Sequence, residues 1–583
     1  MGHRKTMLNR CLAVMLILAL TIMLLPAADT KAKTAKTAVN MKAKSVTKYM
    51  KSLDDHSEDE VYYNGKGDIP YFELNSRLKE VEVCLAFCNP GGLTLNSKIK
   101  GNKVTWSRKT DSGSARVIFD FKKNTITFDD LNAFFWSEGS SLVGGDGYLK
   151  INTDLIQRDE KSSYDQKGKR LVIDLNKYGI KLLRDEKKYY IPIQTYSDLF
   201  YSRFLSYLVF NGENIFISTG ASLGELFDLY KSVEKKKYSK EFAEFNYGEL
   251  CLMFDYLYGL KENHGIKSFD EFFTDTGLDS LIKSRDATDT DLALFEALAL
   301  YIDDLHSGLM CTSYNTDSDK VNSLVDSLPK GNCYAGVGNT WQELTAYREK
   351  QFPDGILPYQ EVGDTAYITF DMFLYENGNR DCSDIPTDED LPALGSDTFR
   401  LVQYAVNKIT NNPEIKNVVL DLSLNGGGMV LAGIYLMAAF LGTGSLAMKD
   451  MTTEARSIAS FKADTNIDGV FDEMDTLADR GLNLYCITSG YSISTSNFVA
   501  TAFKESGKVT LVGRTTGGAP CSVYYVSSAS GSILQISGPG CFGFYKNGVF
   551  YDADRGVEPD VYIKDMSMIY DREKLSKYLK SIK

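Results

Sequence analysis

Histidine is scarce in this chain, with four residues among 583, at positions 3, 56, 264 and 306. The ten cysteines are scattered, and Cys84 and Cys88 form the one close pair. This pair has no companion histidines at metal-ligand spacing, so a zinc site is not indicated, and we expect neither a metal nor a cofactor. Nine cysteines follow residue 28, so at least one of them cannot pair within the chain.

The chain also lacks an excess of positive charge. Its formal net charge is −12, and it falls to −15 when the three basic residues of 1–28 are set aside. Such a body is repelled by nucleic acid and by bare anionic membrane, so we expect neither as a partner. Apolar residues make up 43% and charged residues 24%, values typical of a globular protein with more than one core.

The N-terminus predicts export. Arg4, Lys5 and Arg10 precede an apolar run of 18 residues, Cys11–Ala28, which ends in small residues. This pattern is typical of a signal peptide, and the same run, if retained, would anchor the chain in a membrane. We therefore expect residues 1–28 to be a signal peptide or anchor of a bacterial protein that is secreted or displayed on the extracellular face of the membrane.

Changes in residue pattern divide the rest of the chain. The Lys-, Ala- and Thr-rich segment 29–58 predicts a solvated tether, and short alternating segments predict an N-terminal α+β domain over 59–220. Apolar residues at helical spacing predict a helical domain over 221–335. Strands and helices alternate over 336–583, which predicts an α/β core with largely parallel strand pairing.

Two segments of this core carry the residues needed for acyl transfer. The apolar run that begins at Val418 ends in three glycines, Gly426–Gly428. The later strand Leu482–Thr488 runs into a serine cluster and then a helix-like segment. Bare backbone N–H groups stabilise an oxyanion, and a hydroxyl at a helix start attacks a carbonyl carbon, so the pair predicts a hydrolase.

Five segments in order resemble the C-terminal-processing (tail-specific) and tricorn-type serine peptidases. They are AYITFDMF, the glycine loop DLSLNGGG, the serine cluster SIST, VGRTTGG and GVEPD, all between about residues 360 and 570. The resemblance implies a crotonase-like α/β core, to which the helical segment and the N-terminal α+β domain are added. Many tail-specific relatives carry a PDZ domain before the core, but the interval 311–363 is too short for one.

The resemblance also assigns the catalytic residues. One branch of the family uses a lysine about 25 residues after the serine, where this chain has Ala519. The other branch uses a histidine before the core, where the DDLHSG segment places His306 as general base. Ser494 matches the nucleophile position, and Asp554 or Asp552 would orient the imidazole. The competing interpretation of the serine cluster is a helix cap.

The glycine loop supplies the remaining candidates. The N–H group of Gly427, together with that of Gly428 or Thr495, would form the oxyanion hole, because glycine lets the backbone approach a substrate. Asp421, at the end of the preceding strand, is expected to brace the loop rather than to take part in the chemistry.

These observations predict an exported serine endopeptidase that hydrolyses a polypeptide substrate through an acyl-enzyme. The main alternative is a catalytically inactive surface protein that keeps the fold as a peptide-binding cleft. A scaffold acting through residues 60–218 and a non-peptide esterase are further alternatives. The sequence leaves open the cleavage preference and the oligomeric state.

Overall fold

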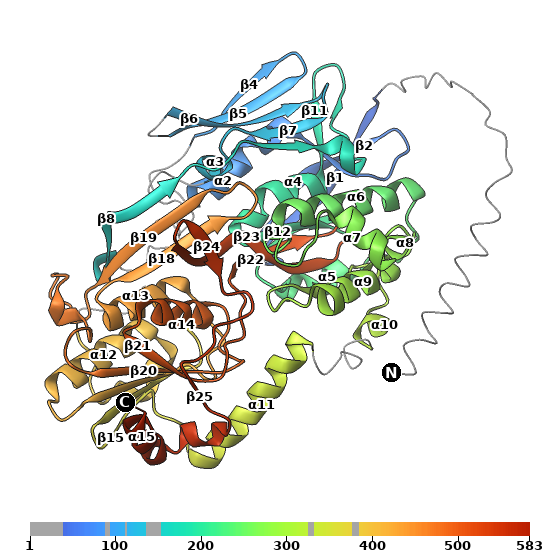
Figure 1. The fold of residues 1–583 in the computed structure, drawn as a ribbon. Coiled ribbons are helices and arrows are strands. Elements are labelled where there is room, and N and C mark those ends of the chain that lie inside the picture. The colour runs from blue at the N-terminus through green and yellow to red at the C-terminus, as the bar shows by residue number, and fades with distance from the viewer. Residues whose placement is uncertain are drawn as a thin grey trace. The chain divides into compact units, whose positions relative to one another are not determined.

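The computed structural model describes residues 39–87, 94–110, 113–135, 153–323, 332–375 and 384–582 (Figure 1). All the elements named below belong to one compact unit, Asn40–Lys583. The predicted signal or anchor lies outside the described residues. Within the ranges given, no helix has both the length and the apolar character needed to cross a membrane.

The N-terminal region forms two sheets. The first has the strand order β10-β11-β3-β2-β1-β13-β12 and the second β4-β5-β6-β7-β9 (Figure 1). Strands of the first sheet are β1 (Met41–Met50), β2 (His56–Asn64), β3 (Tyr71–Glu73), β10 (Leu183–Arg184), β11 (Tyr189–Pro192), β12 (Ser206–Phe210) and β13 (Asn214–Thr219). Strands of the second are β4 (Asn96–Lys100), β5 (Lys103–Thr110), β6 (Gly113–Asp120), β7 (Thr125–Phe128) and β9 (Leu171–Asp174).

Short helices lie between these strands. They are η1 (Leu74–Arg77), α2 (Leu78–Phe87), α3 (Leu131–Phe135), η2 (Thr153–Leu155), η3 (Leu175–Tyr178), α4 (Ile193–Phe200) and η4 (Ser202–Phe204). A shared core buries large aromatic side chains, among them Trp106, Phe119 and Phe200. The region therefore mixes helices with strands, most of which lie in these two sheets.

The prediction of a tether over 29–58 is wrong from Met41 onward. Strand β1 lies in the interior of the first sheet, antiparallel to β2 and parallel to β13. Only Val46 of β1 is fully buried, so the strand has no apolar alternation that would identify it. Backbone pairing on both edges holds this Lys-rich segment in the sheet, and composition does not reveal such pairing.

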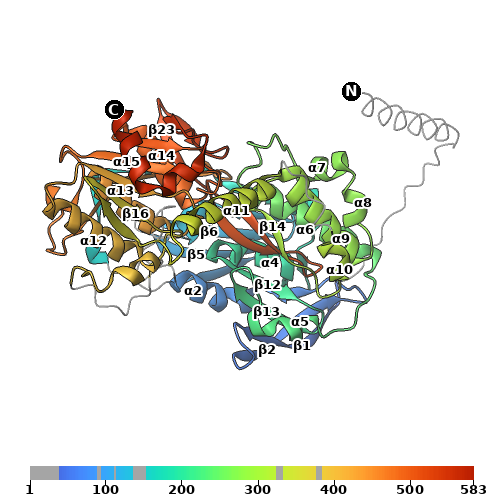
Figure 2. The same ribbon diagram turned by 90° about the horizontal axis from the view of Figure 1, so that it is seen from below.

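Helices predominate over the described residues 221–323 and 332–351. The helices are η5 (Gly224–Leu226), α5 (Phe227–Lys231), α6 (Lys240–Leu257), α7 (Phe269–Thr276), α8 (Asp279–Ile282), α9 (Ala287–Glu296), the π-helical turn η6 (Ala297–Ile302), α10 (Ser318–Asn322) and α11 (Cys333–Gln351). Helices α7 and α8 contact α6, α9 contacts α8, and α10 contacts α9 (Figure 2).

The core contains the expected parallel sheet, in the order β15-β16-β17-β20-β21-β25. Its strands are β15 (Tyr359–Val362), β16 (Thr365–Thr369), β17 (Asn417–Asp421), β20 (Asn483–Thr488), β21 (Val509–Gly513) and β25 (Val561–Tyr562). All neighbouring pairs from β16 to β25 are parallel. Helices and turns of the core are η8 (Leu391–Ser396), α12 (Thr398–Asn411), α13 (Val430–Leu441), η9 (Glu473–Asp475), α14 (Thr495–Ser506), η10 (Met566–Tyr570) and α15 (Arg572–Ser581).

Alternate residues of these strands face two separate cores. Val418 and Leu420 pack with α12, α13 and α14, whereas Val419 packs with residues of α11, η10 and α15. Both faces are therefore covered, which explains why the strands are continuous apolar runs rather than alternating ones. A buried ion pair between Asp421 and Arg572, 3.0 Å apart, fixes the end of β17.

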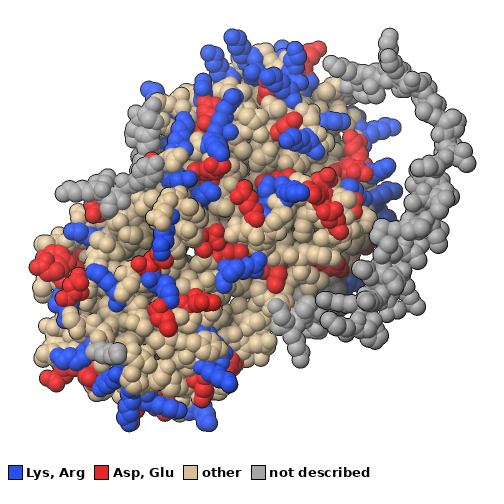
Figure 3. All heavy atoms as spheres, in the orientation of Figure 1, with Lys and Arg blue, Asp and Glu red and all other residues tan. Residues whose placement is uncertain are grey.

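A further sheet joins segments that are distant in sequence. Its main path is β14-β23-β18-β19-β8, with β22 and β24 also paired to β23. The strands are β8 (Ile156–Gln166), β14 (Gly308–Cys311), β18 (Gly444–Asp450), β19 (Arg456–Ala463), β22 (Cys521–Ser527), β23 (Ile533–Lys546) and β24 (Val549–Asp552). The N-terminal and helical regions thus each add a strand to a sheet of the C-terminal α/β core. Acidic and basic side chains are interspersed on the face drawn in Figure 3.

Two carboxyl groups are buried where α4 packs on α6. Asp198 of α4 accepts a hydrogen bond from Gln194, and Glu249 of α6 accepts one from Thr195. The second carboxyl oxygen of each has no hydrogen-bond partner among the described residues. Burial raises the pKa of Glu249 to about 8, although the bond from Thr195 lowers it. Burial and the nearby Glu249 raise the pKa of Asp198.

We expect Glu249→Gln to stabilise the protein at neutral pH. When the pKa of an acid is higher in the folded than in the unfolded state, the protein loses stability as the pH rises between the two values. For Glu249 these values are 4.5 and about 8. The substitution would remove a penalty of about 3 kcal/mol at pH 7, and the difference should vanish below about pH 4.5. Thermal unfolding followed by circular dichroism between pH 4 and pH 8 measures it. Glu244→Gln, an exposed position on the same helix, should change nothing.

Candidate active site

The glycine loop and the serine turn leave the parallel sheet side by side. Strands β17 and β20 are adjacent and parallel, and Asp421 lies opposite Ile487 in their register. The chain after each strand therefore emerges at the same edge of the sheet. Ser489 and Ser492 both donate their hydroxyl protons to carbonyl groups of the glycine loop, at Ser423 and Leu422. These bonds fasten the two loops together.

Ser494 has a strained backbone. Its φ and ψ angles are 57° and −122°, a region that non-glycine residues rarely occupy, at a cost of about 1–3 kcal/mol. Its N–H group donates to the carbonyl oxygen of Gly518 at 3.0 Å, and its own carbonyl accepts from Phe498 as α14 begins. The side chain makes no capping hydrogen bond. A strained serine at a sharp strand-to-helix turn is the arrangement that exposes a nucleophile, so the capping interpretation is not supported for Ser494.

The neighbouring serines of the cluster have other environments. Ser492 is buried, donates to Leu422 and accepts from the N–H of Ser489 at 3.0 Å. Ser496 is also buried, with its hydroxyl lacking a partner among the described residues. Ser494 is partly exposed. Of the three, Ser494 alone combines exposure with a hydroxyl group that bonds to no described residue.

The glycine loop packs directly against Ser494. A Cβ atom on Gly427, whose φ is +92°, would lie 2.7 Å from the Cβ of Ser494 and 2.8 Å from the carbonyl oxygen of Ile493. One on Gly428, whose φ is +126°, would lie 2.3 Å from the carbonyl oxygen of Phe373. Both positions therefore require glycine for space as well as for conformation.

The N–H groups of this loop differ in availability. The N–H of Gly427 donates to the side-chain oxygen of Asn425 at 2.9 Å. Those of Gly428 and Thr495 have no acceptor among the described residues. The hydroxyl of Thr495 donates to the carbonyl oxygen of Gly428 at 2.6 Å, which holds the two residues together. Gly428 and Thr495 are thus the available donors for an oxyanion, whereas Gly427 shapes the loop.

His306 lies in a loop fixed by Asp304. The loop follows η6 and begins at Asp303, whose φ is +51°. One oxygen of Asp304 accepts from the N–H of His306 at 3.0 Å, and the other accepts from the hydroxyl of Ser307. The carbonyl oxygen of His306 accepts from Gln535 on β23 at 3.1 Å. A π-helical turn just before such a loop is frequent at functional sites.

The imidazole of His306 is buried and its Nδ1 has no hydrogen-bond partner among the described residues. Burial lowers its pKa below 6.5, although Asp304 and the backbone of Cys521 act in the opposite direction. The ring is therefore neutral at pH 7 and able to accept a proton. Cys521 lies three residues after Gly518, the partner of Ser494. No hydrogen bond joins His306 to Ser494 among the described residues.

The two candidate acids contact the segment 263–264 rather than His306. Asp554 lies 3.6 Å from Nε2 of His264 and 3.7 Å from Nε of Arg555. Asp552 accepts two hydrogen bonds from the amide of Asn263, at 3.2 and 3.1 Å. Within the described part of the chain, neither acid forms a hydrogen bond or ion pair with His306.

The sequence around His264, KENHG, is typical of a polar turn and gives no sign of a site. The structure buries its side chain to 7% exposure beside Asp554. No local signal could have shown this, because Asp554 lies 290 residues further along the chain. Both acids are therefore in contact with the helical region.

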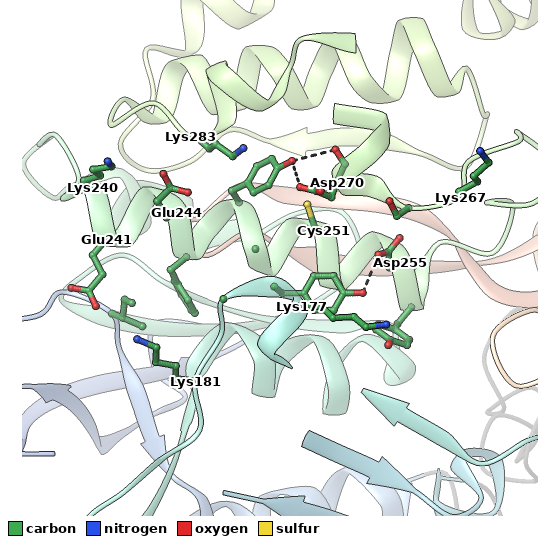
Figure 4. Close-up of a pocket in the computed structure, with 18 of the residues that line it drawn as sticks. Lys177, Lys181, Lys240, Glu241, Glu244, Cys251, Asp255, Lys267, Asp270 and Lys283 are labelled. Atoms are coloured by element: carbon green, nitrogen blue, oxygen red, sulfur yellow. Dashed lines mark hydrogen bonds between the residues drawn. The ribbon is translucent and has the colours of Figure 1, made fainter. Parts of the chain in front are cut away.

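A cavity of about 1040 Å³ lies elsewhere, between α6 and the 177–181 segment of the N-terminal region. Its lining mixes lysines, carboxylates and tyrosines, and includes Cys251, Asp255 and Asp270 (Figure 4). None of the predicted site residues lines it. Within the described ranges, no cluster of three or more His, Cys, Asp or Glu side chains could hold a metal ion.

Comparison with known proteins places the site in a family. Residues 364–563 match peptidase family S41, and this range contains the glycine loop, Ser494 and both acids but neither buried histidine. No curated protein matches the chain. Solved structures that resemble it include a photosystem II D1 C-terminal processing protease (21% identity, 36% of this chain and 46% of that one, TM-score 0.27). A lipoprotein from Streptococcus agalactiae is 16% identical, and the alignment covers 60% of this chain and 99% of that one, with a TM-score of 0.33. A putative peptidase from Parabacteroides merdae is 14% identical, and the alignment covers 53% of this chain and 88% of that one, with a TM-score of 0.35.

The aligned part of this chain thus spans less than half the length of the processing protease. The glycine loop and the strained serine follow neighbouring strands of the parallel sheet, and both lie within the matched residues. Through residues 364–563, the chain carries a serine peptidase domain of family S41.

Proposed function

We propose that this protein is an exported serine endopeptidase in which Ser494 forms an acyl-enzyme with a polypeptide substrate. The observation that carries the proposal is the strained turn at Ser494, packed against a glycine loop with two unoccupied N–H groups among the described residues. The strain at this partly exposed serine does not stabilise the fold. It places the hydroxyl group of Ser494 beside N–H groups that can stabilise an oxyanion. Export is part of the proposal and rests on the apolar run Cys11–Ala28.

The reaction follows from this geometry. The Ser494 oxygen attacks the peptide carbonyl carbon while His306 accepts the hydroxyl proton, and the N–H groups of Gly428 and Thr495 stabilise the oxyanion. The protonated imidazole then gives its proton to the leaving amine, and a water molecule activated by the same imidazole hydrolyses the ester. His306 must reach about 2.6–3.2 Å from the Ser494 oxygen for this transfer, an approach that we assign to the substrate-bound state.

A second function has its own supporting observation. Ser494 forms no hydrogen bond with a histidine of the described chain, and Asp554 is paired with His264 instead of His306. Without an imidazole at the hydroxyl, the same cleft would hold a peptide without cleaving it. This alternative is a peptide-binding surface protein that keeps the peptidase fold.

Fluorophosphonate labelling of residues 29–583 separates the two functions. The reagent reacts with an activated serine, so labelling that maps to Ser494 by peptide mass spectrometry is expected for the peptidase. The same preparation should hydrolyse an unfolded protein such as casein. Absence of labelling in a folded preparation that still binds peptides would favour the binding protein instead.

The pH dependence of the reaction tests the role of His306. Because burial lowers the pKa of His306, its neutral form persists below pH 6.5. We therefore expect kcat/KM to stay constant from about pH 8 to about pH 6.5 and to fall only at lower pH, where the imidazole takes up a proton. Initial rates on a fluorogenic peptide across this range measure it. A decline that begins above about pH 7 would contradict the assignment of a buried imidazole as the base.

A further inference from the structure

We propose that His264 is a positioning residue that keeps the strained turn of Ser494 in place by holding Asp554. The inference rests on the proposed peptidase function, since it concerns the same nucleophile. It assigns a role to a histidine outside the residues that match the S41 family, and it gives Asp554 a partner other than His306.

The turn that carries His264 contacts both Asp552 and Asp554. Asn263 donates twice to Asp552, and Nε2 of His264 lies 3.6 Å from Asp554. The imidazole is fixed on its other side by Tyr258, whose ring meets it edge to face at 6.0 Å between centroids. Nε2 of His264 is buried and has no hydrogen-bond partner among the described residues. A buried imidazole nitrogen with one carboxylate nearby is placed to bind that carboxylate.

Asp554 is in turn packed onto the partner of Ser494. A Cβ atom on Gly518 would lie 2.0 Å from the carbonyl oxygen of Asp554, so the two backbones are in direct contact. The carbonyl oxygen of Gly518 accepts the N–H of Ser494 at 3.0 Å. Three contacts in series therefore connect His264 to the strained residue, from His264 to Asp554, from Asp554 to Gly518 and from Gly518 to Ser494.

Hydrogen bonds tie the same acidic turn to the start of α14. The amide of Asn497 donates to the carbonyl oxygen of Ala553 at 3.2 Å. Thr516 donates to Asn497 at 2.7 Å and accepts from the N–H of Val557 at 2.6 Å. A strained conformation persists only where its surroundings over-determine it, and these bonds provide part of that constraint. The contact between His264 and Asp554 adds a constraint on this turn from the helical region.

This arrangement predicts a specific kinetic defect. Loss of the His264 contact would let the acidic turn move away from Gly518 and relax the turn at Ser494. The Ser494 hydroxyl would then be misplaced for attack on the substrate carbonyl, whereas the surface that binds the substrate would not change. We therefore expect kcat to fall by about 100-fold with little change in KM. Glutamine has an N–H group close to the position of the imidazole Nε2 and should retain most of the activity.

The experiment compares His264→Leu, His264→Gln and His56→Gln with the wild-type protein, residues 29–583. His56 is exposed and remote from the site, so its variant should behave as wild type. Casein hydrolysis, the rate of fluorophosphonate labelling and the thermal midpoint are measured for each. We expect His264→Leu to lose about 100-fold in both rates and His264→Gln to stay within about fivefold of wild type.

Each other outcome is decisive. Wild-type rates in a folded His264→Leu protein would overturn the inference and leave the peptidase function standing. Equal loss in the Leu and Gln variants, with both folded, would also overturn it, because an imidazole acting in proton transfer has no amide substitute. If the wild type neither labels nor cleaves, the proposed function fails and the inference fails with it. If His264→Leu does not fold, the Gln variant decides between positioning and proton transfer.

Discussion

Ser494→Ala should reduce the hydrolysis of an unfolded protein by on the order of 10⁴-fold or more, because no other group can take the acyl intermediate. Of the three serines in the cluster, Ser494 is the one that combines partial exposure with a hydroxyl group free of described partners. Fluorophosphonate labelling should be lost together with hydrolysis. Ser506→Ala, at the far end of α14, should leave both rates unchanged.

Ser494→Gly separates the chemistry from the strain. Both variants lack the nucleophile, but glycine accepts a φ of 57° without a penalty, whereas alanine does not. The glycine variant should therefore be more stable than the alanine variant by about 1 kcal/mol. Thermal or urea unfolding of the two proteins measures the difference. Equal stability would show that the turn at Ser494 is not strained, and cleavage by either variant would remove Ser494 as the nucleophile.

Gly427→Ala should lower kcat by about 100- to 1000-fold, a loss comparable to that of one oxyanion donor. The added methyl group would lie 2.7 Å from the Cβ of Ser494 and 2.8 Å from the carbonyl oxygen of Ile493, in a backbone conformation with φ of +92°. The loop must move away from Ser494, which displaces the N–H group of Gly428 from the position of the oxyanion. Steady-state kinetics on a fluorogenic peptide and the labelling rate both report this displacement.

Gly336→Ala is the matched control for that substitution. Gly336 lies in α11 with open space around the position of an added Cβ atom. Alanine should be neutral there or should stabilise the helix by up to about 1 kcal/mol. Full activity in Gly427→Ala would show that the glycine loop does not shape the oxyanion hole. A defect of equal size in Gly336→Ala would show that the assay reports general damage to the fold.

Much of the peptidase core could be predicted from local pattern. The apolar runs at Val418 and Leu482 predicted strands of a largely parallel core, and the structure pairs these two strands directly, so that the glycines and serines that follow them meet at one edge of the sheet. Loops that follow parallel strands emerge on the same side of the sheet, and the direct pairing of β17 with β20 brings Gly427 and Ser494 together there. The motif order also predicted the family, which the match over residues 364–563 confirms.

The acids and histidines required long-range information. Asp554 and His264 are separated by 290 residues, and neither segment has a pattern that predicts the other. Strand β1 was missed for a related reason, since its stability comes from backbone pairing with β2 and β13 and not from its own side chains.

The sequence by itself determined the chemistry that the core can support: a serine at a helix start, glycines at a strand end, and few histidines to serve it. These features are local, because turn conformation and strand periodicity depend on neighbouring residues. The tertiary structure alone decided that His264 holds Asp554, that His306 is buried and neutral, and that the N–H of Gly427 is already occupied. Burial and partner choice depend on packing between distant segments, and no local pattern specifies them.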